Sequence, residues 1–581
     1  MTVEIDIVTR ELINNTLSSI VDEMALTMQR TAYSPLLRDL FDFCTDITDA
    51  EGNLIAQGLT SPVGVCSKYF VEALKKRWGG DIKPGDVFIG NDPYEGGSHI
   101  PDVNIGRPLF QNGQLVAFIF SIAHQLDMGG RVAGSNACDN INIYQEGLRI
   151  PPLKFYEQGV PNYVLHQIIE KNVRVSHKVL GDISAMVAST AVAERRFREL
   201  IKKYTWPILE QYINSLMDYS EEMTRAAIKA LPDGVYEFED FLDDDGFSDD
   251  PVRIYLKLII EGDSMTFDFT GSSPAVKGSI NHPFTSTVKV IHCGVRAILE
   301  PWVPINSGVL RPTKIIAPEH TIVNAGFPEG VAGRGVTMGR VWDVVSGALA
   351  KVAPDRIPAC CTWVDFGICI GGDDKNREPF IFTDFLMGSW GGRPWADGIS
   401  AQTSYILNYS NVPCEVLERE YPLRIEHYTF VPDSGGPGKY RGGLAYIRDY
   451  RILADDVIVQ WRQDREKFPP WGLQGGKPGT PTRAYYITAD GKEKKLKKSV
   501  FTANSGDLLV AILDGAGGWG NPFERDIDKV VSDVRNEIVS VEAAKRDYGV
   551  VIDPETFDVD LGETQKLREA ASKGIAVEEH S

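Results

Sequence analysis

The first strong pattern in the chain is a helical stripe near its amino terminus. Between Val8 and Arg30, apolar side chains recur at steps of three and four residues, the spacing that places them on one face of an α-helix. The stripe consists of Leu12, Ile13, Leu17, Ile20, Val21, Met24 and Met28. The sequence Tyr33-Ser34-Pro35 ends the pattern, because the residue before a proline avoids helical backbone angles. We expect a helix that packs this face against the core.

Short apolar runs after this helix predict strands. Residues 42–55 predict a hairpin, with its turn at 49–52. The segments 87–90 and 115–122 predict two further strands, because both are rich in β-branched and aromatic side chains. The sequence Gln111-Asn112-Gly113 supplies a turn before the second of them.

The pattern then changes twice along the chain. Residues 165–230 predict a long helical stretch, interrupted near Gly181 and Pro207, that covers a sheet. From Gly234 onward, alternating runs such as VRIYLKLII predict β-structure, which continues with interruptions to Ile512. We therefore expect an α+β fold. Its predicted regions are a mixed α/β part (1–233), a β-rich part (234–330), a glycine-rich part dominated by β-structure (331–522) and a helical tail (523–581).

Composition and charge exclude several classes of protein. Of the 581 residues, 43% are hydrophobic and 24% charged, as is ordinary for a globular chain. The formal net charge is -20, which argues against nucleic acid or an anionic membrane as a partner. Residues 1–10 lack the basic and apolar segments of a signal peptide, and no stretch approaches the ~18 uncharged apolar residues of a membrane span. We expect a cytoplasmic protein without membrane contact.

The eight cysteines predict thiols and not a zinc cluster. None forms a CxxC pair. Cys360 and Cys361 are adjacent, so on a strand they would point to opposite faces. In a reducing compartment most of the eight are expected to be free and buried.

Two glycine-rich segments have the outline of nucleotide-binding motifs. Residues 515–520 match GxGxxG, but Trp519 would crowd a pyrophosphate and no second strand continues a βαβ unit. Residues 472–477 have three residues between the first glycine and the final Gly-Lys, whereas a P-loop has four. We interpret both as tight turns and predict that this chain has no ATP site of its own.

Candidate chemistry is concentrated in two polar segments, each of which follows a predicted strand. NDPYEGGSHIPD places Asp92, His99 and Asp102 in one glycine-rich loop, and AHQLDMGG contains His124 and Asp127. If the strand ends meet, these side chains converge on a site whose nitrogen and oxygen ligands suit Zn, Mn or Fe(II). The alternative is that each histidine is an ordinary polar residue at a strand end. The shared spacing of HIPD and HQLD favours the metal site.

The same segments resemble the hydantoinase B/5-oxoprolinase family. This family includes one subunit of ATP-dependent hydantoinases and lactamases, and related subunits of acetone and acetophenone carboxylases. The resemblance runs in order along nearly the whole chain. It is carried by RTAYSPLLRDLFDFCTDITDAEGNLIAQ (30–57), GDVFIGNDPYEGGSHIPDVNI (85–105), AHQLDMGG (123–130), IYQEGLRIPPLK (143–154), DFTGSSPAVKGSIN (268–281), GGPGKYRGG (435–443) and GAGGWGNP (515–522).

The resemblance implies that the amino-terminal part, 1–233, binds a divalent metal ion: Zn, Mn or Fe. The ligands implied are aspartates and histidines of the matching segments, with some of the aspartates orienting the histidines instead. The candidates are His99, His124, Asp102, Asp127, Asp42 and Asp92. Gln125 stands where family members often have a second histidine, so the resemblance leaves the ligand set open.

The resemblance also implies a partner and a reaction. The partner is an ATP-binding subunit of the hydantoinase A type, expected in a complex of two plus two. It would phosphorylate the carbonyl oxygen of a small cyclic amide and so remove the resonance that makes the amide inert. The metal on this chain would then deliver hydroxide, with Asp127 or Asp102 as general base if it is not a ligand.

Two alternative functions stay open from the sequence. The first is a subunit of an ATP-dependent ketone carboxylase, in which this site would join an enol phosphate to carboxyphosphate. The second is a non-catalytic scaffold that completes the site of the partner. The two clustered His and Asp segments count against the scaffold, since a scaffold has no need of converging ligands.

Overall fold

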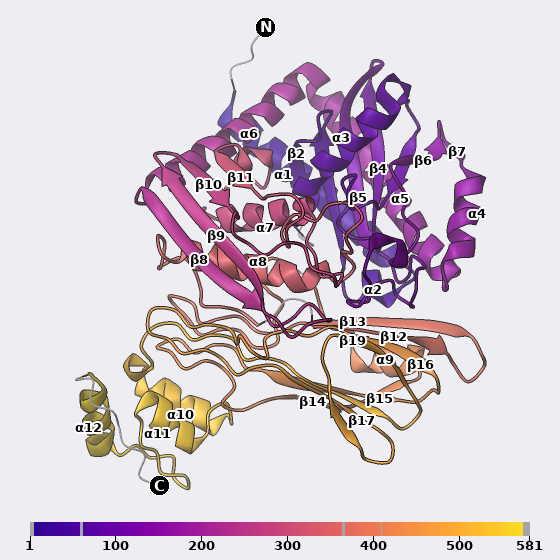
Figure 1. Ribbon diagram of the computed structural model, residues 1–581. Coiled ribbons are helices and arrows are strands. Elements are labelled where there is room, and N and C mark those ends of the chain that lie inside the picture. Colours follow the sequence, from indigo (N-terminus) through magenta and orange to yellow (C-terminus); the bar gives the residue numbers. More distant parts are fainter. Residues whose placement is uncertain (1–4, 59–61, 363–365, 408, 573–581) are drawn as a thin grey trace.

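The computed structural model describes residues 5–58, 62–362, 366–407 and 409–572. Helices and several separate sheets confirm the α+β class. In Figure 1 the amino-terminal helices and sheets lie above a body made of two layered sheets, and the helical tail lies at one end of that body. The division of the chain into four regions stays a prediction.

The amino-terminal part is organised by one antiparallel sheet with the strand order β2-β1-β5-β4-β3-β6-β7. Its strands are β1 (Phe43–Asp49), β2 (Leu54–Gln57), β3 (Val87–Gly90), β4 (Asp102–Gln111), β5 (Gln114–His124), β6 (Leu153–Glu157) and β7 (Val160–Pro161). The predicted hairpin and the two further strands are confirmed. Strand β4 was not predicted, because Gly106 and Pro108 interrupt its apolar pattern. It lies between β3 and β5, which are therefore not neighbours.

Helices cover both faces of this sheet. Helices α1 (Ile7–Thr31) and α5 (Ser176–Tyr204) pack on one face, and α3 (Ser67–Trp78) packs on the other. Side chains alternate along a strand, so in β5 Ile119 contacts the α1 side while Phe118 and Phe120 contact α3. The predicted α1 stripe is buried as expected, except for Leu12, which is 53% exposed and lies outside the core.

The predicted helical stretch over 165–230 contains α4 (Tyr163–Asn172), α5 and α6 (Trp206–Lys229). It is not interrupted at Gly181, which lies inside α5. A Cβ atom at Gly181 would lie 2.4 Å from Cγ of Tyr33, so close packing and not a helix end accounts for this glycine. The break near Pro207 is confirmed, because proline occupies the first turn of α6. A short helix, α2 (Pro35–Arg38), follows α1.

A second, four-stranded sheet packs on two buried helices. The sheet has the order β11-β10-β9-β8. The elements are β8 (Gly234–Leu242), β9 (Val252–Glu261), β10 (Ser264–Asp268), α7 (Phe284–Ala297), β11 (Thr313–Ile316) and α8 (Arg334–Leu349). Helix α8 packs on β8, β9 and α7. The prediction of β-structure here was wrong for α7 and α8, which are buried nearly all round. Both contain short β-branched runs that resemble a strand, such as Val288, Val290 and Ile291 in α7.

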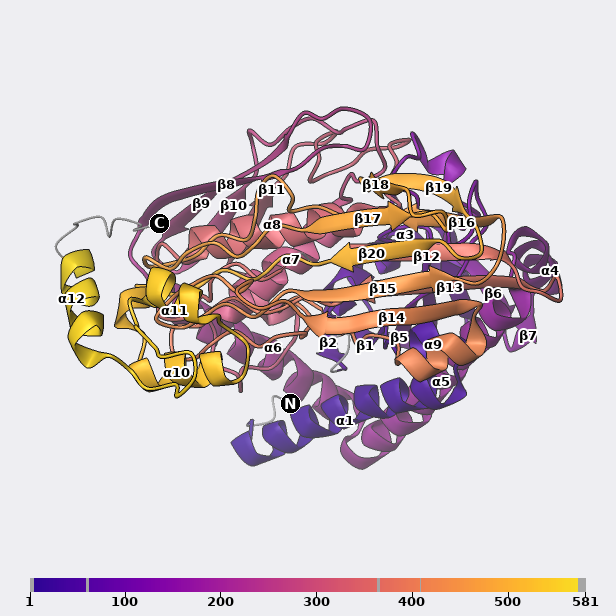
Figure 2. The same ribbon diagram turned by 90° about the horizontal axis from the view of Figure 1, so that it is seen from below.

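The body consists of two further sheets with the orders β13-β12-β16-β19 and β14-β15-β20-β17-β18. Figure 2 shows the second sheet face on, in orange. The elements are β12 (Phe366–Asp373), β13 (Pro379–Leu386), α9 (Cys414–Glu420), β14 (Leu423–Phe430), β15 (Tyr446–Ile452), β16 (Val457–Trp461), β17 (Arg483–Ile487), β18 (Glu493–Lys495), β19 (Ser499–Ala503) and β20 (Leu508–Ile512). The prediction of β-structure to Ile512 is confirmed for this body.

The helical tail is confirmed within the described residues, and residues 573–581 lie outside them. It contains α10 (Ile527–Arg535), α11 (Val541–Tyr548) and α12 (Leu561–Ser572), and α10 and α11 contribute to a small core of their own.

All eight cysteines are thiols, six of them buried. None of the helices described has both the length and the apolar character to span a bilayer.

A buried network of charges fixes α8 to its surroundings. Arg340 of α8 contacts Asp240 of β8 at 2.9 Å and Asp464, which follows β16, at 2.6 Å. Arg465 contacts Asp240 at 3.2 Å and also pairs with Asp343 of α8. Both arginine side chains are fully buried. The network therefore joins the four-stranded sheet, α8 and the body at one point.

We predict that Arg340→Met costs about 3–5 kcal/mol of folding free energy, because it leaves buried carboxylates with an uncompensated charge. The matched control is Arg253→Met. Arg253 pairs with Glu239 at 2.6 Å, but both side chains are more than two-fifths exposed, so this loss should stay below ~1 kcal/mol. Chemical denaturation of the two variants measures the difference. Equal losses would show that the buried network does not stabilise the fold.

Candidate metal centre

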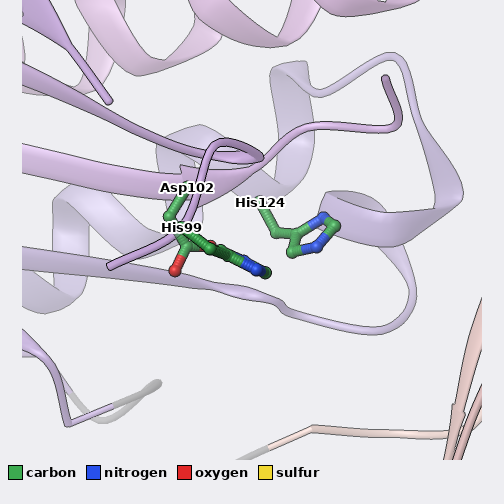
Figure 3. Close-up of side chains that lie close together, drawn as sticks. All are labelled: His99, Asp102 and His124. Atoms are coloured by element: carbon green, nitrogen blue, oxygen red, sulfur yellow. The ribbon is translucent and has the colours of Figure 1, made fainter. Parts of the chain in front are cut away.

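The register of the amino-terminal sheet brings three polar residues to one edge. Asp102 is the first residue of β4 and His124 is the last of β5, and the two lie opposite each other as partners across the ladder. The loop between β3 and β4 carries His99. Asp42 directly precedes β1, and its carbonyl accepts a hydrogen bond from the His124 backbone at 3.1 Å. Figure 3 shows His99, Asp102 and His124 grouped at this edge.

The three side chains are close together and buried. Nε2 of His99 lies 3.1 Å from Oδ1 of Asp102, and the two imidazole centroids are 5.0 Å apart. One ligand atom from each residue lies within 4.8 Å of the other two. The exposed fractions are 6% for His99, 8% for Asp102 and 3% for His124.

Each of the three residues is held through one polar atom and has another available. Nδ1 of His99 lies 3.1 Å from the carbonyl of Ala332, and Nε2 of His124 lies 3.0 Å from the amide nitrogen of Asn136. His99 Nδ1 donates to the Ala332 carbonyl, which leaves its Nε2 as an acceptor. For Nδ1 of His124 to be an acceptor as well, the Asn136 amide must present its oxygen, which has no other partner among the described residues, to Nε2–H. Among the described residues, His124 Nδ1 is buried without a hydrogen bond, and His99 Nε2 faces Oδ1 of Asp102 at 3.1 Å. Such unsatisfied atoms in a protein interior call for a ligand.

Asp102 is oriented in the same way. Its Oδ2 accepts a hydrogen bond from Nη2 of Arg334 at 2.5 Å and another from the hydroxyl of Ser98. Its Oδ1 faces His99. Each ligand candidate is thus fixed by a neighbouring group, as is typical of metal sites.

The electrostatics keep the centre in a ligating state. Burial alone would raise the pKa of Asp102, but its contacts with His99 and Arg334 hold it well below its usual value. Burial and the nearby His99 hold the pKa of His124 well below 6.5, so its ring is neutral. Burial and the charge of Asp102 raise the pKa of Asp42 to about 7, against a hydrogen bond from Tyr409.

A small cavity of about 30 Å³ opens beside these residues. It takes its walls from the amino-terminal sheet, the start of α8 and the body. The lining residues are Asp42, His99, His124, Asn136, Ala332, Arg334, Gly335, Met338, Phe385, Leu407, Tyr409 and Arg462. This space suits an ion with a water molecule.

The residues fit a divalent metal ion. Two imidazole nitrogens and one carboxylate oxygen are ligands for Zn, Mn or Fe(II). Ligands at 2.0–2.2 Å from one ion lie at most about 4.4 Å apart, so the 4.8 Å spread needs only a small inward turn of the side chains. Asp42 lies beside the group as a cavity wall and is a fourth candidate.

The structure does not bring Asp92 and Asp127 into this group. Asp92 accepts the backbone N–H of Tyr94 and contacts Arg149 at 3.4 Å. Both oxygens of Asp127 are engaged by Arg174, through its guanidinium at 2.9 Å and its backbone N–H at 2.8 Å. Through these contacts, Asp92 and Asp127 hold the loops that flank the centre in place.

The sequence analysis did not identify the residues that orient the centre, which lie far from it along the chain. Ala332 and Arg334 are more than 200 residues away from the atoms they contact. Tyr409 and Asn136 were also missed. The signal present for Arg334 was its position between two glycines, Gly333 and Gly335, in an otherwise apolar run.

The fold and the site together define a chain with a buried cluster of two histidines and an aspartate at a sheet edge, where a metal ion could be held. The Hydantoinase B/oxoprolinase family profile matches residues 6–522. The chain belongs to this family. It is 33% identical to a putative D-/L-hydantoinase subunit from Pseudomonas sp. strain NS671, over 97% of this chain and 98% of that protein.

Solved structures agree with this assignment. The crystal structure of the ATP-dependent caprolactamase from Pseudomonas jessenii contains a chain that superposes with a TM-score of 0.90 at 27% identity, covering 98% of this chain and all of that one. Acetone carboxylase in its nucleotide-free form also gives 0.90, at 19% identity, over 98% of this chain and 83% of that one. The second likeness shows the fold alone.

We predict that Gly96→Ala disrupts the loop that carries His99. A Cβ atom at Gly96 would lie 2.3 Å from the backbone nitrogen of Phe70, in α3. The control is Gly113→Ala, which has a similar positive φ but no atom within 4 Å of the new Cβ. Both variants carry the backbone strain of about 1–2 kcal/mol, and only Gly96→Ala adds ~1–3 kcal/mol of overpacking. Thermal melting compares them; matching melting temperatures would contradict the predicted clash.

Proposed function

We propose that this chain is the metal-dependent hydrolytic subunit of an ATP-dependent cyclic amidase. The metal, Zn, Mn or Fe(II), is held by His99, Asp102 and His124. The observation that carries the proposal is the convergence of three buried side chains, His99, Asp102 and His124, whose ligand atoms all lie within 4.8 Å of one another. The relatives named as a hydantoinase subunit and a caprolactamase subunit support the amidase class.

The residues around the cavity have defined tasks in this proposal. When bound, the metal supplies a Lewis acid that lowers the pKa of water and polarises a carbonyl oxygen. Asp42 lines the cavity and is hydrogen-bonded by Tyr409, so it can orient water and accept its proton. Arg334 and Arg462 place positive charge on the cavity wall, which suits a substrate whose carbonyl carries a phosphoryl group. Asp102 is assigned as a ligand and not as the base.

The proposal includes a hydantoinase A-type partner that binds ATP, in a complex of two plus two. The names of the relatives support it, since each describes one subunit of a larger enzyme. The partner would phosphorylate the cyclic amide, and this chain would hydrolyse the phosphorylated amide.

We infer a cytoplasmic location, because all eight cysteines are reduced thiols, as is typical of a reducing compartment.

We predict that His99→Ala and His124→Ala each lose stoichiometric metal. Removing a nitrogen ligand should lower metal affinity by more than the ~10–100-fold that loss of a supporting group costs. The control is His177→Ala, whose side chain is exposed on α5. Elemental analysis of the purified proteins is the measurement, with melting curves to show that each variant folds. Full metal content in either ligand variant would make that histidine a structural residue.

We predict that product forms only when the partner is present with ATP. Hydantoins and lactams are offered in one set of reactions, and ketones with bicarbonate in another, and product and ADP are quantified. Ring opening with the first set supports the amidase. Carboxylation with the second would replace it by the carboxylase. His99→Ala should abolish product while leaving part of the ATP turnover, because the phosphorylation is assigned to the partner.

A further inference from the structure

Glu146 is a buried carboxyl group that the proposed reaction does not use. It follows a 3₁₀ turn, η3 (Ile143–Gln145), and its side chain is fully buried. Among the described residues it pairs with no lysine, arginine or histidine, and its partners are backbone N–H groups. A buried acid without a counter-charge is costly. We propose that Glu146 is a positioning residue for the candidate metal centre, which holds residues 329–333 so that their backbone orients His99; the metal part of this inference rests on the proposed function.

Residues 329–333, here called the strap, lead directly into α8. They belong to neither a helix nor a strand, so their backbone polar groups need partners from other parts of the chain. The carbonyl of Gly330 accepts a hydrogen bond from the side chain of Asn281 at 3.0 Å, and the N–H of Gly333 donates to the carbonyl of Ser279 at 2.8 Å. These contacts hold the two sides of the strap but not its middle.

Glu146 holds the middle of the strap. The N–H of Val331 donates to Oε1 of Glu146 at 2.6 Å, and the N–H of Ala332 donates to the same carboxyl group. The carbonyl of Ala332 in turn accepts the hydrogen bond from Nδ1 of His99 at 3.1 Å. Glu146 and His99 therefore bind the two backbone polar groups of one residue. Without the carboxyl group, two buried N–H groups would lose their acceptor, and the strap would have to move to find another.

The strap also connects Glu146 to Asp102. The carbonyl of Val331 accepts a hydrogen bond at 3.0 Å from the backbone N–H of Arg334, the first residue of α8. The guanidinium of Arg334 contacts Asp102 at 2.5 Å. A displaced strap would therefore disturb Asp102 as well as His99, which are two of the three ligand candidates.

Close backbone packing keeps Glu146 itself in place. A Cβ atom at Gly130 would lie 2.7 Å from the carbonyl carbon of Glu146, and one at Gly147 would lie 2.5 Å from the carbonyl oxygen of Met128. A Cβ atom at Gly330 would lie 2.9 Å from Oε1 of Glu146, so the strap and the carboxyl group are also in close contact. Glu146 is thus fixed to the segment that follows His124 and holds the strap against it.

The protonation state of Glu146 suggests how to remove its hydrogen bonds alone. Burial raises the pKa of Glu146 to about 8, against the hydrogen bonds from the N–H groups of Ala332 and Val331. At pH 7 the group is therefore mainly the neutral acid, and its oxygen still accepts hydrogen bonds. Glu146→Gln keeps the shape and an acceptor oxygen, whereas Glu146→Leu fills the space without an acceptor. Comparing these two variants separates hydrogen bonding from packing.

Asp182, in α5, provides a matched control away from the strap. It is fully buried and accepts the backbone N–H groups of Tyr33 and Ser34 at 2.7 and 3.1 Å. One oxygen of Asp182 and one of Glu146 are buried without a hydrogen bond among the described residues. Glu146→Ala and Asp182→Ala therefore remove the same kind of group. Both should lower the melting temperature, and only Glu146→Ala should affect the ligand candidates.

The first measurement needs no metal. The chain has nine histidines, so labelling their rings with ¹⁵N gives a small set of NMR signals, and His99→Ala identifies those of His99. The shifts of the ring nitrogens report protonation and hydrogen bonding. We expect the His99 shifts to move in Glu146→Ala and Glu146→Leu and to stay native in Glu146→Gln and Asp182→Ala. Native His99 shifts in a folded Glu146→Ala or Glu146→Leu chain would overturn the proposal.

The second measurement uses cobalt(II) as the probe, added to the full-length chain after its own metal has been removed. The visible spectrum of cobalt(II) depends on the geometry of its ligands. Glu146→Ala and Glu146→Leu should bind it about 10–100-fold more weakly, as is typical when a supporting group is lost, and with an altered spectrum. Glu146→Gln and Asp182→Ala should match the native chain. The same affinity in all four variants would make Glu146 a purely structural residue.

Together the two measurements separate this inference from the proposed function. If the native chain binds no cobalt(II) while the His99 shifts respond as expected, the metal centre is wrong and the positioning of His99 by Glu146 stands. If cobalt(II) binds to the native chain and is lost in His99→Ala, but the Glu146 variants bind it as tightly as the native chain, the metal centre stands and the positioning role is wrong.

Discussion

The buried network of Arg340 and Arg465 is the constraint on which the arrangement of this protein depends. Each of its charges would be costly in isolation, because the protein interior solvates ions poorly. The network pairs opposite charges: Arg340, Arg465 and Lys498 face the buried carboxylates of Asp240, Asp343 and Asp464, and Lys498 also contacts Asp244. Such a set is satisfied only when the sheet, the helix and the body meet in one geometry. It specifies their relative position more sharply than apolar contact does, since apolar surfaces can slide.

Helix α8 connects this charge network to the candidate metal centre. Arg334 and Arg340 both belong to α8, six residues or about 9 Å apart along its axis. A helix buried on all sides transmits position rigidly. Fixing Arg340 therefore fixes Arg334 against Asp102, and it brings the carbonyl of Ala332 to His99. The sheet supplies the ligand candidates, but an element more than 200 residues later orients them.

The sequence could predict whatever depends on local periodicity. The α1 stripe was predicted because its buried residues recur at helical spacing. Strands β3 and β5 were predicted because they are short apolar runs rich in β-branched and aromatic residues. Helices α7 and α8 are buried nearly all round and contain β-branched runs that resemble strands, so the sequence concealed them. Strand β4 was hidden by Gly106 and Pro108 within it.

The candidate site likewise contains residues that a local pattern predicted and residues that only the tertiary fold brings together. His99, Asp102 and His124 were predicted from two short segments on the expectation that β3 and β5 are neighbours. In the structure β4 lies between these strands, and its first residue, Asp102, is the one that meets His124. Asp92 and Asp127 stand in the same segments, and no local pattern distinguishes a ligand from a residue that braces the loop through Arg149 or Arg174. Arg334 and Tyr409 come from parts of the chain that only the tertiary fold brings near.

The glycine-rich segment 515–520 uses its backbone for packing within the chain. A phosphate cradle needs backbone N–H groups that point at the ligand. In residues 515–520 these groups are already used: Gly517 donates to Cys360, Gly518 to Lys477 and Gly520 to Leu473, all at 2.8–2.9 Å. A Cβ atom at Gly517 would lie 2.0 Å from the carbonyl of Trp471. These glycines allow backbone to pack on backbone, and that packing uses the donors that a nucleotide would require.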